Sequence, residues 1–109
     1  KTGCPGALTY SMTKSALNNL VISLSKEIGN KRIRINSVMP GFCDTELVQK
    51  YSESLTYDCI RENIKRTIFK EAITTEQVAD LIKFLLSKDS YGIQSQSVII
   101  DGGGINADS

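Results

Sequence analysis

The sequence predicts an α/β fold, in which strands of a parallel sheet are joined through helices. Apolar residues recur at three- and four-residue steps over residues 9–28 and again over 74–87, which is typical of amphipathic helices. Residues 32–39 and 97–100 are short β-type runs, each placed after one of these helical segments. Helix, strand, helix and strand in this order indicate the crossover connection of a parallel sheet. We therefore expect two strands and about four helices, forming the C-terminal part of a larger doubly wound sheet.

The first helix is predicted from about Thr9 to Ile28, where Gly29-Asn30 supplies a stop signal. Tyr10 and Lys14 fall in its first turns, and residues four apart share one helix face. A phenol beside an ammonium is a better acid and base, because the cation and the positive helix N-terminus both favour the phenolate. The pair is therefore a candidate for proton transfer. The alternative is a solvated helix face, which shows the same spacing.

Two strands and a capped helix are predicted further along the chain. Residues 32–39 alternate apolar and polar side chains as a strand does, and Pro40-Gly41 ends the run. Thr74 and Gln77 fit a capping box, with a hydroxyl at the N-cap and an amide three residues later. The run Ser97-Val98-Ile99-Ile100 is short, apolar and β-branched, as expected of a buried parallel strand.

Residues 44–70 are more polar and less clearly patterned. Short helices are predicted at Glu46–Tyr51 and Leu55–Thr67. A long segment after a strand end is often a mobile lid, and its apolar residues would then line a substrate pocket or anchor the lid. The alternative is a plain surface insertion.

The composition is that of an ordinary soluble domain, with 40% hydrophobic and 23% charged residues. The net charge of +1 gives no electrostatic case for nucleic acid or an anionic membrane, and no apolar run is long enough to cross a bilayer. Cys4, Cys43 and Cys59 are widely spaced, which predicts reduced thiols of a cytoplasmic protein rather than a metal site. Because the chain has no His, acid–base chemistry would use Tyr, Lys or a carboxylate.

Four short motifs follow one another along the chain. They are Tyr10-Ser11-Met12-Thr13-Lys14-Ser15-Ala16, Arg34-Ile35-Asn36-Ser37-Val38, Pro40-Gly41-Phe42-Cys43-Asp44-Thr45 and Ile99-Ile100-Asp101-Gly102-Gly103. In order and spacing they resemble the catalytic YxxxK, the R-V-N-x-V strand, the P-G-x-x-x-T loop and the closing V-D-G-G of the classical short-chain dehydrogenase/reductase family. The resemblance covers essentially the whole chain. One departure is Gln94-Ser95-Gln96, which replaces the family's T-G-Q and so lacks its Gly.

The resemblance implies a Rossmann-type fold and reversible hydride transfer between NAD or NADP and a small-molecule alcohol or ketone. Tyr10 would donate a proton to the carbonyl oxygen in reduction and remove the hydroxyl proton in oxidation. Lys14 would lower the pKa of Tyr10 from a reference of about 10 and would hydrogen-bond the ribose of the nicotinamide. By the same resemblance, the full-length protein is expected to be a homodimer or homotetramer.

The resemblance also implies a cofactor-binding loop formed by Pro40, Gly41, Phe42, Cys43 and Thr45. Pro40 and Gly41 would shape the backbone beside the nicotinamide, and Gly admits close approach because it has no Cβ. The backbone of Phe42 and Cys43 would lie near the carboxamide, and the Thr45 hydroxyl would bond it or the pyrophosphate. The alternatives are a strand-ending turn at Pro40-Gly41 and a helix N-cap at Thr45.

The Gly run after the last strand is not expected to bind phosphate. A phosphate cradle precedes a helix N-terminus, and no helix is predicted after Asp101-Gly102-Gly103-Gly104. Tight packing after the strand is the expected use of these glycines.

In domain terms, residues 1–109 are assigned by the resemblance to the C-terminal part of one domain, with residues 46–70 as the substrate lid. The N-terminal dinucleotide-binding half and the family's substrate-orienting Ser are expected upstream, and the isolated chain is expected to be inactive. One alternative is a non-catalytic relative that keeps the fold for binding or scaffolding, which the Tyr10/Lys14 pair opposes. Another is a helical interaction module, which the apolar strand Val98–Ile100 opposes.

Overall fold

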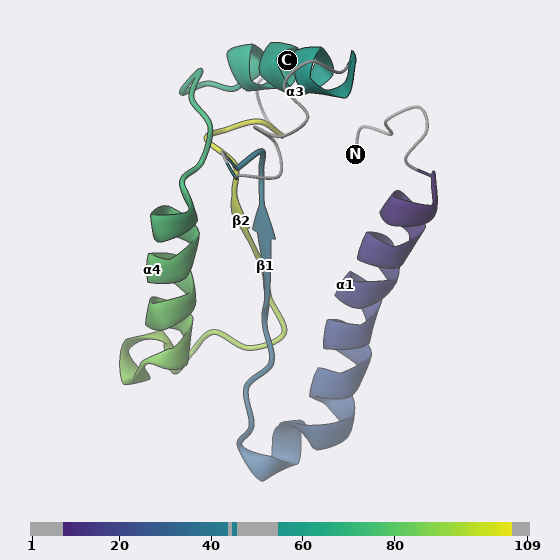
Figure 1. Ribbon diagram of the computed structural model, residues 1–109. Helices are drawn as coiled ribbons and strands as arrows, with labels where there is room; N and C mark the ends of the chain where they lie inside the picture. The colour runs from purple at the N-terminus through teal and green to yellow at the C-terminus, as the bar shows by residue number, and fades with distance from the viewer. Residues whose placement is uncertain (1–7, 44, 46–54, 106–109) are drawn as a thin grey trace. The chain divides into compact units, whose positions relative to one another are not determined.

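The computed structural model describes residues 8–43, 45 and 55–105. Within them, the main elements are α1 (Leu8–Ile28), β1 (Ser37–Pro40), α3 (Leu55–Arg66), α4 (Thr75–Leu86) and β2 (Ser97–Ile100), with short 3₁₀ turns η1 (Gly29–Lys31) and η2 (Lys88–Ser90) (Figure 1). The predicted α/β class is confirmed. The chain divides into two compact units: the first comprises residues 1–37 and 85–98, and the second comprises residues 38–84 and 99–109.

The two strands lie side by side and form a two-stranded sheet (Figure 1). The Ser37 amide donates to the Gln96 carbonyl at 2.9 Å, and the Gly41 amide donates to the Ile100 carbonyl at 2.8 Å. Residue numbers rise in the same direction along both strands between these two bonds, so the strands are parallel. The bounds predicted for the second strand are confirmed, and the long connection through α3 and α4 is the crossover that parallel pairing requires.

The prediction that the first strand begins at residue 32 is wrong, because the strand starts at Ser37. The residues before Ser37 are hydrogen-bonded by the side chain of Gln94 and are not part of a regular strand ladder. The Gln94 amide accepts from the Ile35 amide at 2.8 Å and donates to the Ile33 carbonyl at 3.1 Å. Alternating sequence alone does not distinguish these two ways of satisfying an extended backbone.

The other partner segment explains why regular pairing begins late. Ser95 has a left-handed backbone, with φ of 60°, so the chain is not extended immediately before β2. Asn36 spans this kink: its amide nitrogen donates to the Ile93 carbonyl at 2.9 Å, and its oxygen accepts from the Gln96 amide at 3.0 Å. The Ser95 amide still donates to the Ile35 carbonyl at 2.9 Å, but regular strand pairing begins only beyond this kink.

Helix α1 covers the predicted range within one residue and ends at Ile28, before the predicted Gly29-Asn30 stop. Arg32 then adopts a left-handed conformation and donates its amide to the Gly29 carbonyl at 3.2 Å. One face of the helix is buried or half-buried; its members are Ser11, Asn18, Val21, Leu24, Ser25 and Ile28. These positions recur with the helical period, so they define the inward face of α1.

Helix α4 has the predicted capping box. The Thr74 hydroxyl accepts from the Gln77 amide at 3.2 Å, and the Gln77 side chain accepts from the Thr74 amide at 2.9 Å. At the other end, the Arg34 guanidinium donates to the Leu85 carbonyl at 2.8 Å and to the Ser87 carbonyl at 3.2 Å. A cation at this end is favourable because the helix dipole is negative there.

In the second unit, the segment that follows α3 joins the loop after β1 to the segment after β2. The Ile73 amide donates to the Phe42 carbonyl at 3.0 Å, and Ile73 also bridges Cys43 in parallel. The Phe69 amide donates to the Gly102 carbonyl at 3.1 Å. Helix α3 confirms the helix predicted at Leu55–Thr67, whereas the helix predicted at Glu46–Tyr51 lies outside the described residues.

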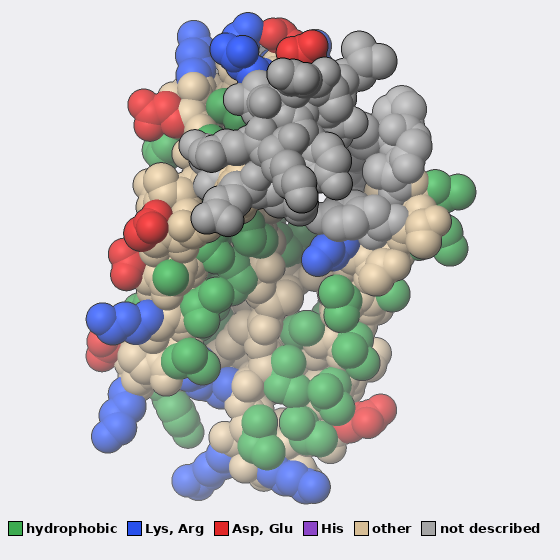
Figure 2. All heavy atoms as spheres, viewed as in Figure 1, with side chains coloured by type: hydrophobic (Ala, Val, Ile, Leu, Met, Phe, Trp, Pro, Cys, Tyr) green, Lys and Arg blue, Asp and Glu red, His purple; other side chains and the backbone are tan. Residues whose placement is uncertain are grey.

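The apolar core is small within the described part of the chain. Its buried hydrophobic residues are Ile73 and Leu85, while Leu86 is 81% exposed, Met12 65% and Ile99 47%. Figure 2 shows that many apolar side chains are exposed on this face of the molecule. None of the described helices is both long and apolar enough to cross a membrane.

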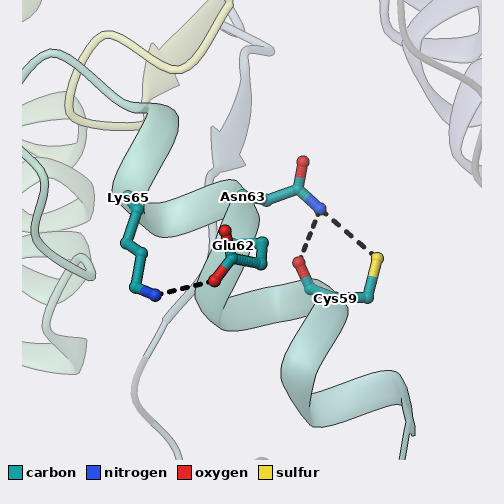
Figure 3. A network of polar contacts seen from close by, with 4 residues as sticks. All are labelled: Cys59, Glu62, Asn63 and Lys65. Atoms are coloured by element: carbon teal, nitrogen blue, oxygen red, sulfur yellow. Dashed lines mark hydrogen bonds and ion pairs between the residues drawn. The ribbon is translucent and has the colours of Figure 1, made fainter.

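Helix α3 carries polar contacts between residues three and four apart (Figure 3). Lys65 pairs with Glu62 at 2.7 Å, and the Asn63 amide donates to the Cys59 carbonyl at 2.8 Å. The hydrogen bond from Lys65, reinforced by its charge, lowers the pKa of the Glu62 carboxyl. Because both partners are well exposed, the ion pair adds little to stability.

Candidate functional site

Tyr10 and Lys14 both lie on α1, one helical turn apart, as the sequence predicts. By helical register, both positions belong to the inward face that Asn18 and Ser25 share, rather than to the opposite face. The Lys14 side chain is exposed at this end of the helix.

Asn18 occupies the next position along this face, four residues after Lys14. Its amide oxygen lies 3.2 Å from the Ser37 hydroxyl oxygen and 3.3 Å from the Ser97 hydroxyl oxygen. The two hydroxyls also bond each other at 2.8 Å. Since Ser37 opens β1 and Ser97 opens β2, a side chain of α1 contacts the first residue of each strand.

The predicted cofactor loop leaves the end of β1 in the second unit. Pro40 and Phe42 are exposed, and Gly41, Cys43 and Thr45 are half-buried. Pro40 is the last residue of the strand, which agrees with its missing amide hydrogen. The loop thus presents an apolar ring and an apolar pyrrolidine on its surface.

Gly41 is required by protein packing, whatever else the loop binds. A Cβ on Gly41 would lie 2.9 Å from both the Cα and the Cβ of Asp101. Real Cβ atoms do not approach this closely, so the first residue after β2 fills the space that a side chain would need. The sequence argument attributed this glycine to the approach of a cofactor, and the structure supplies a second and sufficient reason.

The Cys43 thiol is held within its own loop. Its Sγ lies 3.6 Å from the Gly41 carbonyl oxygen, and the bridge to Ile73 fixes the backbone. Burial raises the pKa of the Cys43 thiol above its ordinary value, because desolvation disfavours the thiolate. The thiol therefore reacts more slowly than an ordinary cysteine at neutral pH.

The Gly run after β2 folds around the Asp101 carboxylate. One oxygen accepts from the Gly103 amide at 2.9 Å, and the other accepts from the Ile105 amide at 2.8 Å. Gly102 and Gly103 have φ of 62° and 84°, a conformation natural to glycine. Because a protein carboxylate already occupies these two amides, they do not form a phosphate cradle.

Asn18 was not singled out by the sequence analysis. A signal was present in the sequence, because Asn18 continues the four-residue step of Tyr10 and Lys14. The contact between Gly41 and Asp101 had no sequence signal, because the two residues are far apart in the chain. Among the described residues, no group of three or more potential metal ligands is close enough to hold an ion.

Comparison with known proteins gives a consistent family match. A family model described as "Enoyl-(Acyl carrier protein) reductase" matches residues 1–104. The 3-oxoacyl-[acyl-carrier-protein] reductase of Chlamydia muridarum is 35% identical over 101 residues, covering 93% of this chain and 39% of that protein. The chain therefore spans less than half the length of this curated relative.

Solved structures agree with the sequence match. A short chain dehydrogenase family protein from Francisella tularensis superimposes with a TM-score of 0.82 and 28% identity, over 94% of this chain and 46% of that one. A 4-hydroxyisoleucine dehydrogenase complexed with NADH gives a TM-score of 0.76 and 28% identity, over 87% of this chain and 38% of that one. Their fold is the one predicted from the sequence.

Proposed function

The chain belongs to the short-chain dehydrogenase/reductase family, and on that premise we propose that it supplies the proton-transfer pair and one wall of the nicotinamide site of an NAD- or NADP-dependent oxidoreductase. Tyr10 is the general acid and base, and Lys14 is its electrostatic partner. The observation that supports the proposal is the four-residue step of Tyr10 and Lys14 along α1, in helical register with the half-buried Asn18.

The chemistry of these side chains, each taken by itself, suits a nicotinamide dinucleotide. Pro40 and Phe42 offer exposed apolar surface for a flat ring, and Lys14 offers an exposed ammonium for ribose hydroxyls. Thr45 adds a half-buried hydroxyl. The bound nicotinamide would carry the hydride, while the chain's own residues bind it and move the proton.

The proton step assigned to this chain occurs at the phenol oxygen of Tyr10. In reduction the phenol gives its proton to the substrate oxygen, and in oxidation the phenolate takes the hydroxyl proton. The Lys14 ammonium favours the phenolate and so brings the phenol pKa closer to neutral pH. No metal is needed for this step, since the ammonium supplies the positive charge.

We propose an alcohol or a ketone as the substrate, taken from the chemistry that the relatives share. The Chlamydia relative is named as a reductase of a 3-oxoacyl group, and the solved relative is named as a dehydrogenase of a hydroxylated amino acid. The molecules differ, but each name describes interconversion of a carbonyl and a hydroxyl group. Residues 46–70 are proposed as the lid over this substrate.

We further propose that residues 1–109 form the C-terminal part of a larger cytoplasmic domain that assembles as a homodimer or homotetramer. Ile99 of β2 is 47% exposed, and a central strand needs cover on that face. Met12 and Leu20 are 65% and 54% exposed on the outer face of α1, where a second copy would cover them. The free thiols of Cys43 and Cys59 agree with a reducing compartment.

The test of the acid–base assignment is Tyr10→Phe in the full-length protein. We expect turnover to fall by about 10²-fold or more, with little change in dinucleotide affinity, because only the proton-transfer group is removed. Lys14→Met should weaken both turnover and dinucleotide binding. The matched control is Tyr91→Phe, since Tyr91 is exposed in the turn after η2. Unchanged turnover in Tyr10→Phe would support the non-catalytic alternative instead.

The cofactor loop has a test that does not depend on activity. In the full-length protein, NADH or NADPH should slow alkylation of Cys43, and Cys59 on exposed α3 serves as the internal reference. Equal alkylation of Cys43 with and without saturating dinucleotide would contradict the assignment of Pro40–Thr45 to the cofactor site.

A further inference from the structure

We infer that Asn18 is a positioning residue for the proton-transfer pair, because its side-chain contacts with Ser37 and Ser97 fix the rotation of α1 that presents Tyr10 and Lys14. The inference rests on the proposed function. It concerns a residue outside the four family-like motifs that the sequence analysis identified.

The first argument is the direction of the contact. The Asn18 amide oxygen lies 3.2 Å from the Ser37 Oγ and 3.3 Å from the Ser97 Oγ, and the two hydroxyls are 2.8 Å apart. In a consistent pattern, Ser37 donates to Ser97 and Ser97 donates to Asn18. Because hydrogen bonds are restricted in distance and angle, this three-residue cluster restricts the rotation of α1 about its own axis.

The inward-facing residues that follow Asn18 on α1 do not provide the same restraint. Val21, Leu24 and Ile28 are half-buried apolar residues, whose contacts are non-directional and tolerate rotation and sliding. Ser25 is buried, but its hydroxyl has no hydrogen-bond partner. Asn18 therefore contributes orientation where these neighbours contribute mainly burial.

The second argument is distance along a rigid helix. Lys14 and Tyr10 lie about 6 Å and about 12 Å along the axis from Asn18, at about 1.5 Å per residue. A helix rotation of about 15° would move a side chain at a radius of about 6 Å by roughly 1.5 Å. Since a misplacement of about 1 Å can cost about 10²-fold in rate, a small loss of restraint at Asn18 would be visible in turnover.

The experiment uses the full-length protein and three variants with a matched control. Asn18→Leu has similar size and cannot accept a hydrogen bond, and Ser97→Ala removes the donor from the other side of the contact. Ser97→Thr keeps a hydroxyl and is the conservative variant. The control is Asn19→Leu, the same substitution at the next residue, which is exposed.

We expect Asn18→Leu to lower kcat by about tenfold or more. Its pH profile for oxidation should also shift, with half-maximal kcat moved up by about half a unit or more, because a displaced Lys14 stabilises the phenolate less. Ser97→Ala should shift both in the same direction and should add nothing to Asn18→Leu, since both remove one contact. Ser97→Thr and Asn19→Leu should behave as the unmodified protein.

Several results separate this inference from simpler ones. If Asn18→Leu lowers only the melting temperature and keeps the kcat and pH profile of Asn19→Leu, Asn18 is merely structural and the inference is overturned. If Asn18→Leu does not fold, Ser97→Ala decides, because Ser97 is exposed and its truncation leaves burial almost unchanged. If Tyr10→Phe in the same series keeps full turnover, the proposed function itself fails, which is a distinct outcome.

Discussion

Gly41 and Asp101 are in direct backbone contact, with space for a hydrogen atom on Gly41 but not for a methyl group. A Cβ on Gly41 would lie 2.9 Å from the Cα and the Cβ of Asp101, and 3.5 Å from its carbonyl carbon. The Asp101 carboxylate is also bonded to the amides of Gly103 and Ile105. The backbone after β1 and the backbone after β2 are thus packed directly against each other at Gly41, within the proposed cofactor loop.

Gly41→Ala should destabilise the protein by about 1–3 kcal/mol, because the added methyl group meets backbone atoms that cannot rotate away. The matched control is Gly92→Ala, whose Cβ would have no atom within 4 Å and whose φ is not left-handed. Gly92→Ala should be neutral or stabilise by up to about 1 kcal/mol. Urea unfolding of the full-length protein measures both, and equal midpoints would contradict the close contact.

Ser95→Gly should stabilise the protein by about 0.5–1 kcal/mol. Ser95 has φ of 60°, where a Cβ is unfavourable by about 1–2 kcal/mol. Part of this gain is offset, because glycine loses more conformational entropy on folding than serine does. Ser95→Ala keeps the Cβ and should show no such gain, which separates backbone strain from loss of the hydroxyl. Thermal unfolding checks the pair, and a lower Tm for the glycine variant would contradict the strain argument.

Arg34→Lys should destabilise by about 2–3 kcal/mol, although the charge is kept. The guanidinium donates to the Leu85, Ser87, Ser90 and Ile93 carbonyls and to the Ser90 hydroxyl. An ammonium cannot reproduce this planar arrangement, so several of these part-buried carbonyls would each lose one of their hydrogen-bond donors. Arg32→Lys is the control, because Arg32 is exposed and its backbone bond to Gly29 is unaffected. Similar unfolding free energies for the two variants would refute this role.

Ser25→Ala should stabilise α1 by about 1 kcal/mol more than Ser23→Ala does. Both substitutions gain the same helix propensity, but only Ser25 has a buried hydroxyl without a partner, which costs desolvation. Ser23 is exposed on the same helix and serves as the reference. A gain no larger than that of Ser23→Ala would mean that the Ser25 hydroxyl is satisfied in solution.

Cys43 should react slowly with alkylating reagents at neutral pH and faster as pH rises through the region above its ordinary pKa. Burial raises the pKa of this thiol, and only the thiolate is nucleophilic. Mass spectrometry of the alkylated protein follows the rate at each pH, with exposed Cys59 on the same chain as reference. Rapid labelling of Cys43 at pH 7, equal to that of Cys59, would be inconsistent with the buried thiol.

Local patterns in the sequence determined the elements that depend on short-range chemistry. Thr74 and Gln77 form the predicted capping box, and α4 begins at Thr75, the residue after the N-cap. This was predictable because both partners lie within one helical turn. The predicted bounds of β2 match because a β-branched run and a Gly turn delimit it. The start of β1 was mispredicted because long-range side-chain bonds from Gln94 replace the strand ladder there.

By itself, the sequence determined the α/β class, the order of the elements, the family and the four-residue step that joins Tyr10 to Lys14. These follow from periodicity and motif spacing, which are local or strictly ordered along the chain. The tertiary structure alone decided that Gly41 packs on Asp101, that Arg34 caps α4 and that Asn18 bonds Ser37 and Ser97. Each is a contact between residues far apart in sequence, whose geometry is set by packing and not by any local preference.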